Sequence, residues 1–107
     1  MKINIKATNL YLTPSLKTYI DNKFATLSKI ISKFESQGEI LIHFEVARTT
    51  RHHHKGEVFM TEANLALPGK TLRAAEGGSD VRRALDVMLH KLKLEIEKYK
   101  NKKRRIH

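Results

Sequence analysis

The sequence predicts an α+β fold, a two-layer β-α-β-β-β-α domain in which both helices pack on one face of a four-stranded mixed sheet. Three observations predict this class. Apolar residues recur at spacings of three and four in two long segments, and they alternate with polar residues in four shorter segments. The 107 residues, 40% of them hydrophobic, suffice for one compact core. We therefore expect one domain over residues 1–107, with a basic extension from about residue 98 to residue 107.

The first strand and the first helix are predicted from the N-terminal third of the chain. Apolar and polar residues alternate over residues 2–8, which is typical of a strand with one buried face. Thr13 and Pro14 then indicate a helix start, because threonine can accept from free amides and proline at the first position loses no hydrogen bond. The helix should continue for about six turns and end near Gln37-Gly38. Its apolar stripe comprises Leu16, Ile20, Phe24, Leu27, Ile31 and Phe34. Beside this stripe lies a flank that is typical of a solvated helix surface and comprises Tyr19, Lys23, Thr26, Ile30 and Lys33.

Three further strands are predicted in the middle of the chain. Residues 39–48 and 56–67 alternate, and residues 49–55 form a polar connection between them. Pro68-Gly69 signals a tight turn, after which a short strand over residues 70–75 returns antiparallel. Short connections favour an antiparallel meander, and the strand-helix-strand crossover places the first strand beside it in parallel. The side chains expected on the buried face are Ile40, Ile42, Phe44, Val46, Phe59, Thr61, Ala63, Leu65 and Leu67.

Residues 79–105 predict one long helix. Gly77-Gly78 should break the preceding segment, and Ser79 or Asp80 can cap the helix start. Val87 and Leu94 lie outside the apolar stripe and could form a small contact patch. The stripe itself comprises Val81, Leu85, Met88, Leu92, Ile96 and Tyr99, and it needs a sheet to cover it.

Charge and composition restrict the classes of function. The net charge is +10 and the pI is about 10.0, which favours nucleic acid or an anionic membrane surface as partner. Residues 98–107 carry six Lys and Arg and no acid. The absence of cysteine excludes disulfides and thiolate chemistry. The N-terminus lacks the apolar run of a signal peptide, and no segment reaches the length of a membrane span, so we expect a soluble cytoplasmic protein without membrane partner.

Catalytic and metal chemistry find little support in the sequence. His52-His53-His54 could place two imidazoles on one ion, but no third or fourth ligand stands at a spacing typical of zinc sites. The alternatives are a solvated hairpin tip, or a tip that joins Arg51 and Lys55 against a phosphate backbone. No HExxH, Walker loop, GxSxG or GxGxxG occurs. We therefore expect no enzyme activity, no cofactor, no metal and no small-molecule substrate.

The long helix carries cations on both sides of its apolar stripe. At 100° per residue, Arg82, Lys93, Lys100 and Arg104 fall on one flank, and Lys91, Lys102 and Arg105 fall on the other. Lysines near helix ends also serve solubility and the helix dipole. Six unopposed charges in eight residues exceed that need, so we favour contacts with phosphates.

The chain resembles the ribosome hibernation promoting factor family, the short ribosome-associated translation inhibitors. The resemblance rests on the order and spacing of MKINIKATN, LTPSLKTYIDNKFATLSKI, HHHKGEVFMTEANLALPGKTLRA and the D-x-x-x-A-L-D pattern followed by HKL from Asp80 to Leu92. It implies a β-α-β-β-β-α fold that binds the small ribosomal subunit between head and body, over the path of messenger RNA and the decoding sites. It also implies RNA contacts at Lys23 and Lys29 in the first helix and at Lys91 and Lys98 in the second.

The sequence departs from the family in three places. Arg82 stands where an aromatic residue is usual, and Leu94 stands near the position of a basic residue. The C-terminal dimerisation domain of the long members does not follow residue 107, so we expect a monomer when free. The candidate RNA-binding residues are Lys23, Lys29, Lys33, Arg51, Lys55, Arg82, Arg83, Lys91, Lys93, Lys98, Lys100, Lys102, Lys103, Arg104 and Arg105.

Two alternative functions remain. A generic double-stranded RNA-binding module shares the α-β-β-β-α core, but such modules place a lysine-rich motif at the start of the last helix, where this chain has GGSDVRR. A metal-dependent enzyme would have to use the loop of His52 to His54.

Overall fold

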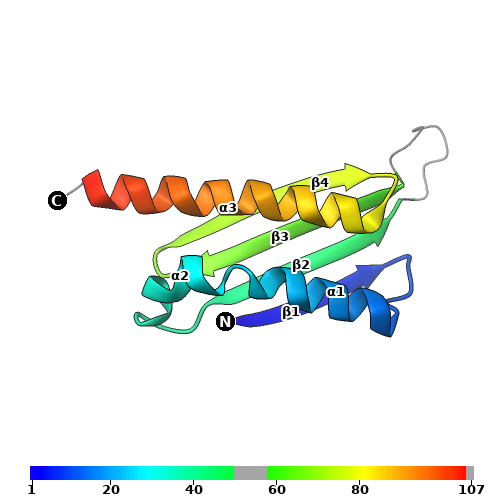
Figure 1. Ribbon diagram of the computed structural model, residues 1–107, viewed down its shortest axis with the longest axis horizontal. Helices are drawn as coiled ribbons and strands as arrows, with labels where there is room; N and C mark the ends of the chain where they lie inside the picture. The colour runs from blue at the N-terminus through cyan, green and yellow to red at the C-terminus, as the bar shows by residue number, and fades with distance from the viewer. Residues whose placement is uncertain (50–57, 106–107) are drawn as a thin grey trace.

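The computed structural model describes residues 1–49 and 58–105, and the side chains of these residues up to 102. The elements follow in the order β1 (Lys2–Thr8), α1 (Pro14–Ala25), α2 (Ser28–Glu35), β2 (Leu41–Arg48), β3 (Phe59–Leu67), β4 (Lys70–Gly78) and α3 (Val81–Arg105), as Figure 1 shows. The sheet order is β1-β2-β3-β4. β1 pairs with β2 in parallel, and the other two pairs are antiparallel, which confirms the predicted four-stranded mixed sheet.

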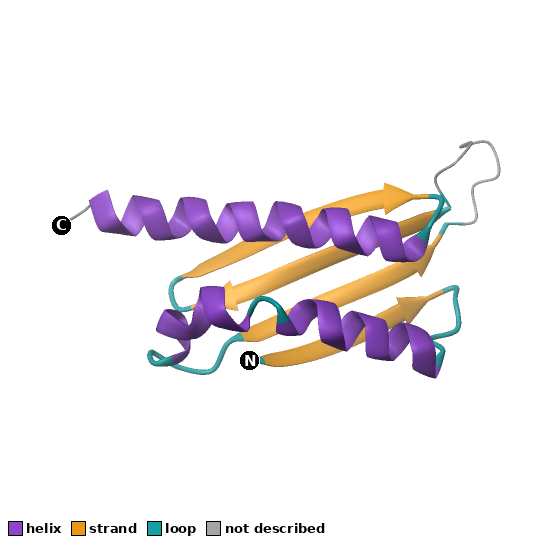
Figure 2. Cartoon of the chain, viewed as in Figure 1, coloured by secondary structure: helices purple, strands orange, loops and turns teal. Residues whose placement is uncertain are grey.

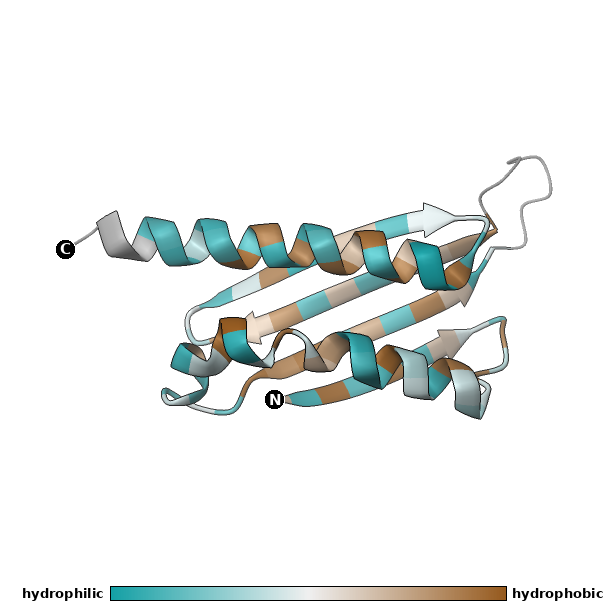
Figure 3. Ribbon diagram, in the orientation of Figure 1, coloured by the Kyte–Doolittle hydropathy of each residue, from teal (hydrophilic) through white to brown (hydrophobic). Residues whose placement is uncertain are grey.

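The helices lie on one face of the sheet and leave the other face uncovered (Figure 2). α3 crosses β3 and β4, while α1 and α2 lie over the half of the sheet that β1 and β2 form. Figure 3 shows apolar segments recurring along α3 and giving way to polar ones toward its C-terminus. The predicted two-layer α+β architecture is therefore confirmed.

The first helix differs from the prediction because it is two helices. The helical ladder tightens at the break, where the amide of Leu27 bonds to the carbonyl of Phe24 at 3.0 Å. The Thr26 hydroxyl donates to the Lys23 carbonyl at 2.6 Å, which offers the backbone a local alternative to the helical ladder. The apolar stripe survives the break, because all six of its predicted residues are buried. At the start of α1, the Thr13 hydroxyl accepts from the Leu16 amide at 3.1 Å and confirms the predicted cap.

The fourth strand is longer than predicted. β4 continues through Gly77 and Gly78, which pair with Met60 and Phe59 rather than breaking the segment. A missing side chain does not prevent a residue from joining a ladder on backbone hydrogen bonds alone. α3 then starts at Val81, and of the two candidate caps Asp80 serves, accepting from the Arg82 amide at 3.0 Å.

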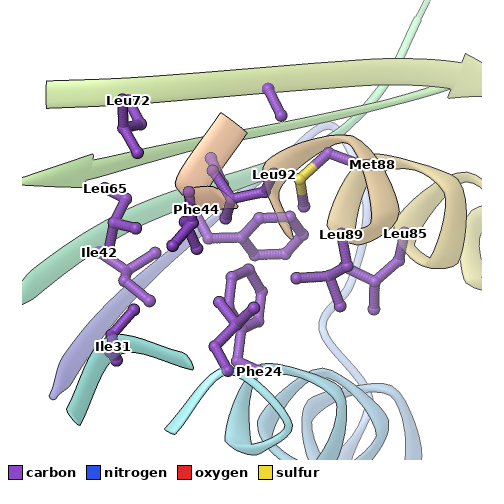
Figure 4. Close-up of a cluster of buried hydrophobic side chains, with 14 of the residues drawn as sticks. Phe24, Ile31, Ile42, Phe44, Leu65, Leu72, Leu85, Met88, Leu89 and Leu92 are labelled. Carbon is purple, nitrogen blue, oxygen red and sulfur yellow. The ribbon is translucent and has the colours of Figure 1, made fainter. Parts of the chain in front are cut away.

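The core lies between the helices and the sheet, as Figure 4 shows. The rings of Phe24 and Phe44 meet edge to face with centroids 5.0 Å apart, and Met88 and Leu92 of α3 lie beside them. Leu89 is also buried, so the apolar stripe of α3 is wider than predicted. Full burial of each large apolar side chain stabilises the fold by about 1.5–3 kcal/mol. Val81, Tyr99 and Phe59, which were predicted to face the core, are only partly buried.

Candidate nucleic-acid interface

Two helices of the layer, α1 and α3, are joined by a polar contact around Tyr19. Its hydroxyl donates to the Asp86 carboxylate, with oxygens at 2.8 and 3.0 Å. The Lys23 ammonium lies 3.4 Å from the same carboxylate and 5.4 Å from the centre of the Tyr19 ring. Side chains 67 positions apart in sequence therefore link the two helices.

Arg82 completes this contact from the first turn of α3. Its guanidinium lies 5.3 Å from the centre of the Tyr19 ring and donates to the Ser15 hydroxyl at 3.1 Å. We call the five residues Ser15, Tyr19, Lys23, Arg82 and Asp86 the clasp. Partial burial, and then the hydrogen bond to Asp86 and its charge, raise the pKa of Tyr19 above its usual value. The clasp holds two predicted cations, of which Lys23 pairs with Asp86 and Arg82 lies over the Tyr19 ring.

The β4-facing flank of α3 carries cations that are each paired with a carboxylate. Lys91 pairs with Glu76, and its ammonium also reaches the Ala75 carbonyl at the outer edge of the sheet. Lys98 pairs with Glu95 one turn earlier, at 3.6 Å. Lys91 and Lys98 are therefore compensated, whereas Lys102, on the same flank by its spacing, has no carboxylate partner among the described residues.

Seven predicted cations have no carboxylate partner among the described residues, and three of them, Arg82, Arg83 and Lys102, lie in the first and last turns of α3. The other four are Lys29 and Lys33 on α2 and Lys93 and Lys100 on α3, and we call these four the open cluster. Lys93 and Lys100 share the flank of α3 that carries Asp86, because the spacing is seven residues each time. At Asp86 this flank faces α1, as the clasp shows.

Two members of the open cluster stand next in sequence to the residues that form the contact between α2 and α3. The rings of Phe34 and Tyr99 stack there with centroids 5.7 Å apart. Lys33 and Lys100 are the chain neighbours of these two rings. α1 lies beside the first half of α3 and α2 beside a later part (Figure 1), so the α1–α3 contact of the clasp precedes the α2–α3 contact along α3.

The remaining candidates lie at the ends of α3 or outside the described residues. Arg83 is exposed in the first turn, and its amide approaches the Asp80 carboxylate. Lys102 is exposed in a segment of α3 that extends beyond the sheet (Figure 1). Lys103, Arg104 and Arg105 continue that helix, but their side chains are not among those described. The predictions for Arg51, Lys55 and His52 to His54 also fall outside the described residues.

The uncovered face of the sheet carries charges of both signs. Glu45 and Glu62 stand opposite each other in the register of β2 and β3. Each has its own partner, since the Thr8 hydroxyl donates to Glu45 at 2.7 Å and Arg73 pairs with Glu62. A hollow of about 230 Å³ beside them is lined mostly by polar side chains of β1, β2 and β3. Mixed charge gives this face no basic platform for RNA.

Neither a metal site nor a membrane span is found in the described part of the chain. No group of three or more His, Asp or Glu side chains there could hold a metal ion. No helix there is both long and apolar enough to cross a membrane. The hypothesis of a metal site at the histidine loop is not tested by these residues.

Sequence reasoning missed which of the predicted cations are compensated. Asp86 was not a candidate, although it stands on the same flank of α3 as Arg82 and Lys93. The helical spacing was the available signal. It could not reveal that α1 brings Tyr19 and Lys23 to this acid, because that depends on which helices become neighbours.

The fold and the helical surface define a two-layer α+β protein with a cationic helical face. The chain belongs to the family described as Sigma 54 modulation protein / S30EA ribosomal protein, whose family model matches residues 3–104. This confirms the resemblance that the sequence motifs indicated.

Curated relatives agree with this assignment. The ribosome hibernation promoting factor of Klebsiella oxytoca is 26% identical over 102 residues, which are 95% of this chain and 96% of that protein. The ribosome hibernation promotion factor of Picosynechococcus sp. is 30% identical over 104 residues, which are 95% of this chain but 50% of that longer protein.

Two solved structures show the same fold. A ribosomal subunit interface protein from Coxiella burnetii superposes with a TM-score of 0.75 at 24% identity, covering 94% of this chain and 99% of that one. The N-terminal domain of Protein Y from Thermus thermophilus superposes with a TM-score of 0.73 at 21% identity, covering 92% and 99%.

Proposed function

We propose that this protein is a cytoplasmic ribosome hibernation factor. It binds the RNA of the small ribosomal subunit at the decoding region and inhibits translation by occupying the place of messenger and transfer RNA. Membership of the family and the names of the relatives support this role. The observation that carries the RNA contact is the open cluster, whose four cations have no described carboxylate to neutralise them.

The chemistry of this role is electrostatic and requires no reaction. Phosphates would replace counterions at Lys29, Lys33, Lys93 and Lys100. The basic side chains at the C-terminal end of α3 would add further contacts. Phosphate contacts of this kind fix position and orientation rather than reading sequence. A protein acting by occlusion should inhibit in proportion to the ribosomes it occupies, without turnover.

The double-stranded RNA-binding alternative is less well supported. Such a module would use the start of the last helix to grip phosphates. In this chain the Asp80 carboxylate already accepts from the amides of Arg82 and Arg83 there. An acid at that point opposes a phosphate, so we favour contacts along the helix flanks.

The proposal is tested by sedimentation with separated ribosomal subunits and by titration of a purified translation system. We expect binding to the small subunit, and inhibition that saturates near one protein per ribosome. Inhibition that persisted at protein far below the ribosome concentration would overturn occlusion.

A matched pair of charge reversals locates the surface. Lys29→Glu with Lys33→Glu changes α2, and Lys2→Glu with Lys6→Glu changes the uncovered face of β1 by the same net charge and the same spacing. All four lysines are exposed, so both variants should fold. We expect the α2 variant to lose small-subunit binding and the β1 variant to retain most of it. Equal losses would indicate that net charge alone governs binding.

A further inference from the structure

Tyr11 is a large aromatic side chain that the fold leaves in solvent. It lies in the connection between β1 and α1 and is 78% exposed. Among the described residues, none stacks on its ring or forms a hydrogen bond with its hydroxyl. A single exposed apolar residue needs no explanation by itself, so its setting decides what it can do.

The backbone on both sides of Tyr11 is anchored. Leu10 and Leu12 are partly buried and pack against the core. Asn9 before them has a φ of 58°, a left-handed conformation that asparagine tolerates better than most residues. Thr13 after them caps α1. With both neighbours turned into the core, the Tyr11 ring is held outward, and ordering it on a ligand requires little further loss of freedom.

Arginines lie at the same end of the molecule. The connection from β1 to α1 and the start of α3 are both found there (Figure 1). Ser15, in the first turn of α1, accepts from the Arg82 guanidinium at 3.1 Å, so this turn and the first turn of α3 are in direct contact. Arg83 is exposed in that turn of α3. An outward aromatic ring therefore stands at an end of the molecule that also carries two guanidinium groups.

We infer that Tyr11 stacks on an unpaired base of single-stranded RNA while Arg82 and Arg83 contact neighbouring phosphates. Aromatic rings beside cations are the combination by which proteins hold single strands, because every base has a face to stack on. Bases within a duplex are already stacked, which makes a single-stranded segment the fitting ligand. This inference rests on the proposed binding to RNA and adds to it a base contact outside the open cluster.

A tryptophan reporter tests the stacking directly. The chain contains no tryptophan, so Tyr11→Trp introduces a single tryptophan whose fluorescence can be followed. The probe is a single-stranded RNA of about twelve nucleotides, compared with a duplex of the same sequence. Met60→Trp, 39% exposed on the uncovered face of the sheet, is the control. We expect the single strand to quench Tyr11→Trp strongly, the duplex to quench it less, and neither to quench Met60→Trp appreciably.

Affinity measurements separate stacking from charge. Tyr11→Ala should weaken binding of the single strand by about five- to a hundredfold, the range for loss of one stacked base. Its salt dependence should not change, because no charge is lost. Tyr11→Phe should bind like the original chain, since the ring is kept. The melting temperature should not move in either variant.

The outcomes distinguish this inference from the proposed function. If the original chain binds the small subunit and the single strand, but Tyr11→Ala binds both equally well, stacking is overturned and the proposed function stands. If Tyr11→Ala binds the single strand normally and loses only the ribosomal subunit, Tyr11 contacts protein and the inference is likewise overturned. If the original chain binds neither RNA nor subunit, the proposed function itself fails.

Discussion

The clasp and the open cluster belong to one helical layer, but the cations of the clasp have partners within the protein and those of the open cluster have no described acid beside them. In the clasp, Lys23 and Arg82 lie against the ring of Tyr19, with Asp86 between the helices. In the open cluster, Lys33 and Lys100 stand beside the stacked rings of Phe34 and Tyr99, with no described acid to pair with. Lys23 is already paired with an acid and helps to hold α1 against α3, whereas the unpaired lysines of the open cluster remain available to an anion. The comparison teaches that counting lysines does not locate an interface.

The largest effect on binding is expected from the extension of α3 past the sheet. Replacing Lys102, Lys103, Arg104 and Arg105 by glutamine keeps a good helix former at each position and removes four charges. We expect affinity for the small subunit to fall by about tenfold or more, and the salt slope to flatten by about 0.7–0.9 per lost phosphate contact. Stability should change by about 1 kcal/mol or less, because only helix-dipole interactions are lost.

The measurement is a salt titration of subunit binding together with thermal unfolding. A chain stopped after Tyr99 is the second variant, since the hydroxyl of Tyr99 and its stack on Phe34 can still fix the shortened helix. Unchanged affinity and slope in both variants would remove the C-terminal segment from the interface.

Neutralising one lysine at a time compares unpaired with paired lysines directly. Lys33→Gln removes a cation without a described partner, and we expect the salt slope to fall by about 0.7–0.9. Lys23→Gln and Lys91→Gln remove cations that Asp86 and Glu76 already neutralise in part. The salt slope of binding should therefore fall less in these two variants. Surface changes of this kind should alter stability by about 0.5 kcal/mol at most. Equal slopes for all three would mean that the ion pairs open on binding without cost.

The sequence was sufficient to predict most of the fold. All six apolar residues from Leu16 to Phe34 are buried as their spacing predicted, even though the helix breaks at Thr26, because the same face continues across the break. The predicted end of the fourth strand at residue 75 was wrong, because pairing with β3 extends the strand to Gly78 through residues that by themselves disfavour a strand.

The candidate site was less predictable than the fold. Spacing along α3 assigned each cation to one side of the helix. Whether that cation is neutralised depends on the side chains of the strand or helix that packs beside it. Lys91 meets Glu76, and Lys23 meets Asp86, only because β4 and α3 take their places in the fold. The sequence therefore predicted where the charges stand, and the tertiary structure determined which of them are compensated.

Removing the acid of the clasp should have a smaller effect, in the opposite direction. Asp86→Asn keeps a hydrogen-bond acceptor for the Tyr19 hydroxyl and frees the charge of Lys23. We expect affinity for the small subunit to rise by about two- to fivefold, the range for one surface ion pair, and stability to fall by about 1 kcal/mol or less. Isothermal binding measurements and thermal unfolding provide the two values. A loss of affinity would show instead that Asp86 positions Lys23 for its ligand.

The smallest effect concerns the ionisation of Tyr19. Partial burial and the Asp86 carboxylate raise the pKa of its hydroxyl above 10.0, so the fold favours the neutral form. This contribution to stability is fully present below the pKa of the unfolded chain, near 10.0, and is lost as the pH rises through the higher pKa of the folded chain. In Asp86→Asn the pKa of Tyr19 should fall, because both contributions of Asp86 are lost while burial still raises this pKa and Lys23 still lowers it. Ultraviolet titration of tyrosinate measures this in a background of Tyr11→Phe and Tyr99→Phe, which leaves Tyr19 as the single tyrosine. An unchanged titration after Asp86→Asn would show that the Asp86 carboxylate does not contribute to the raised pKa of Tyr19, and that the acid of the clasp serves Lys23 and not Tyr19.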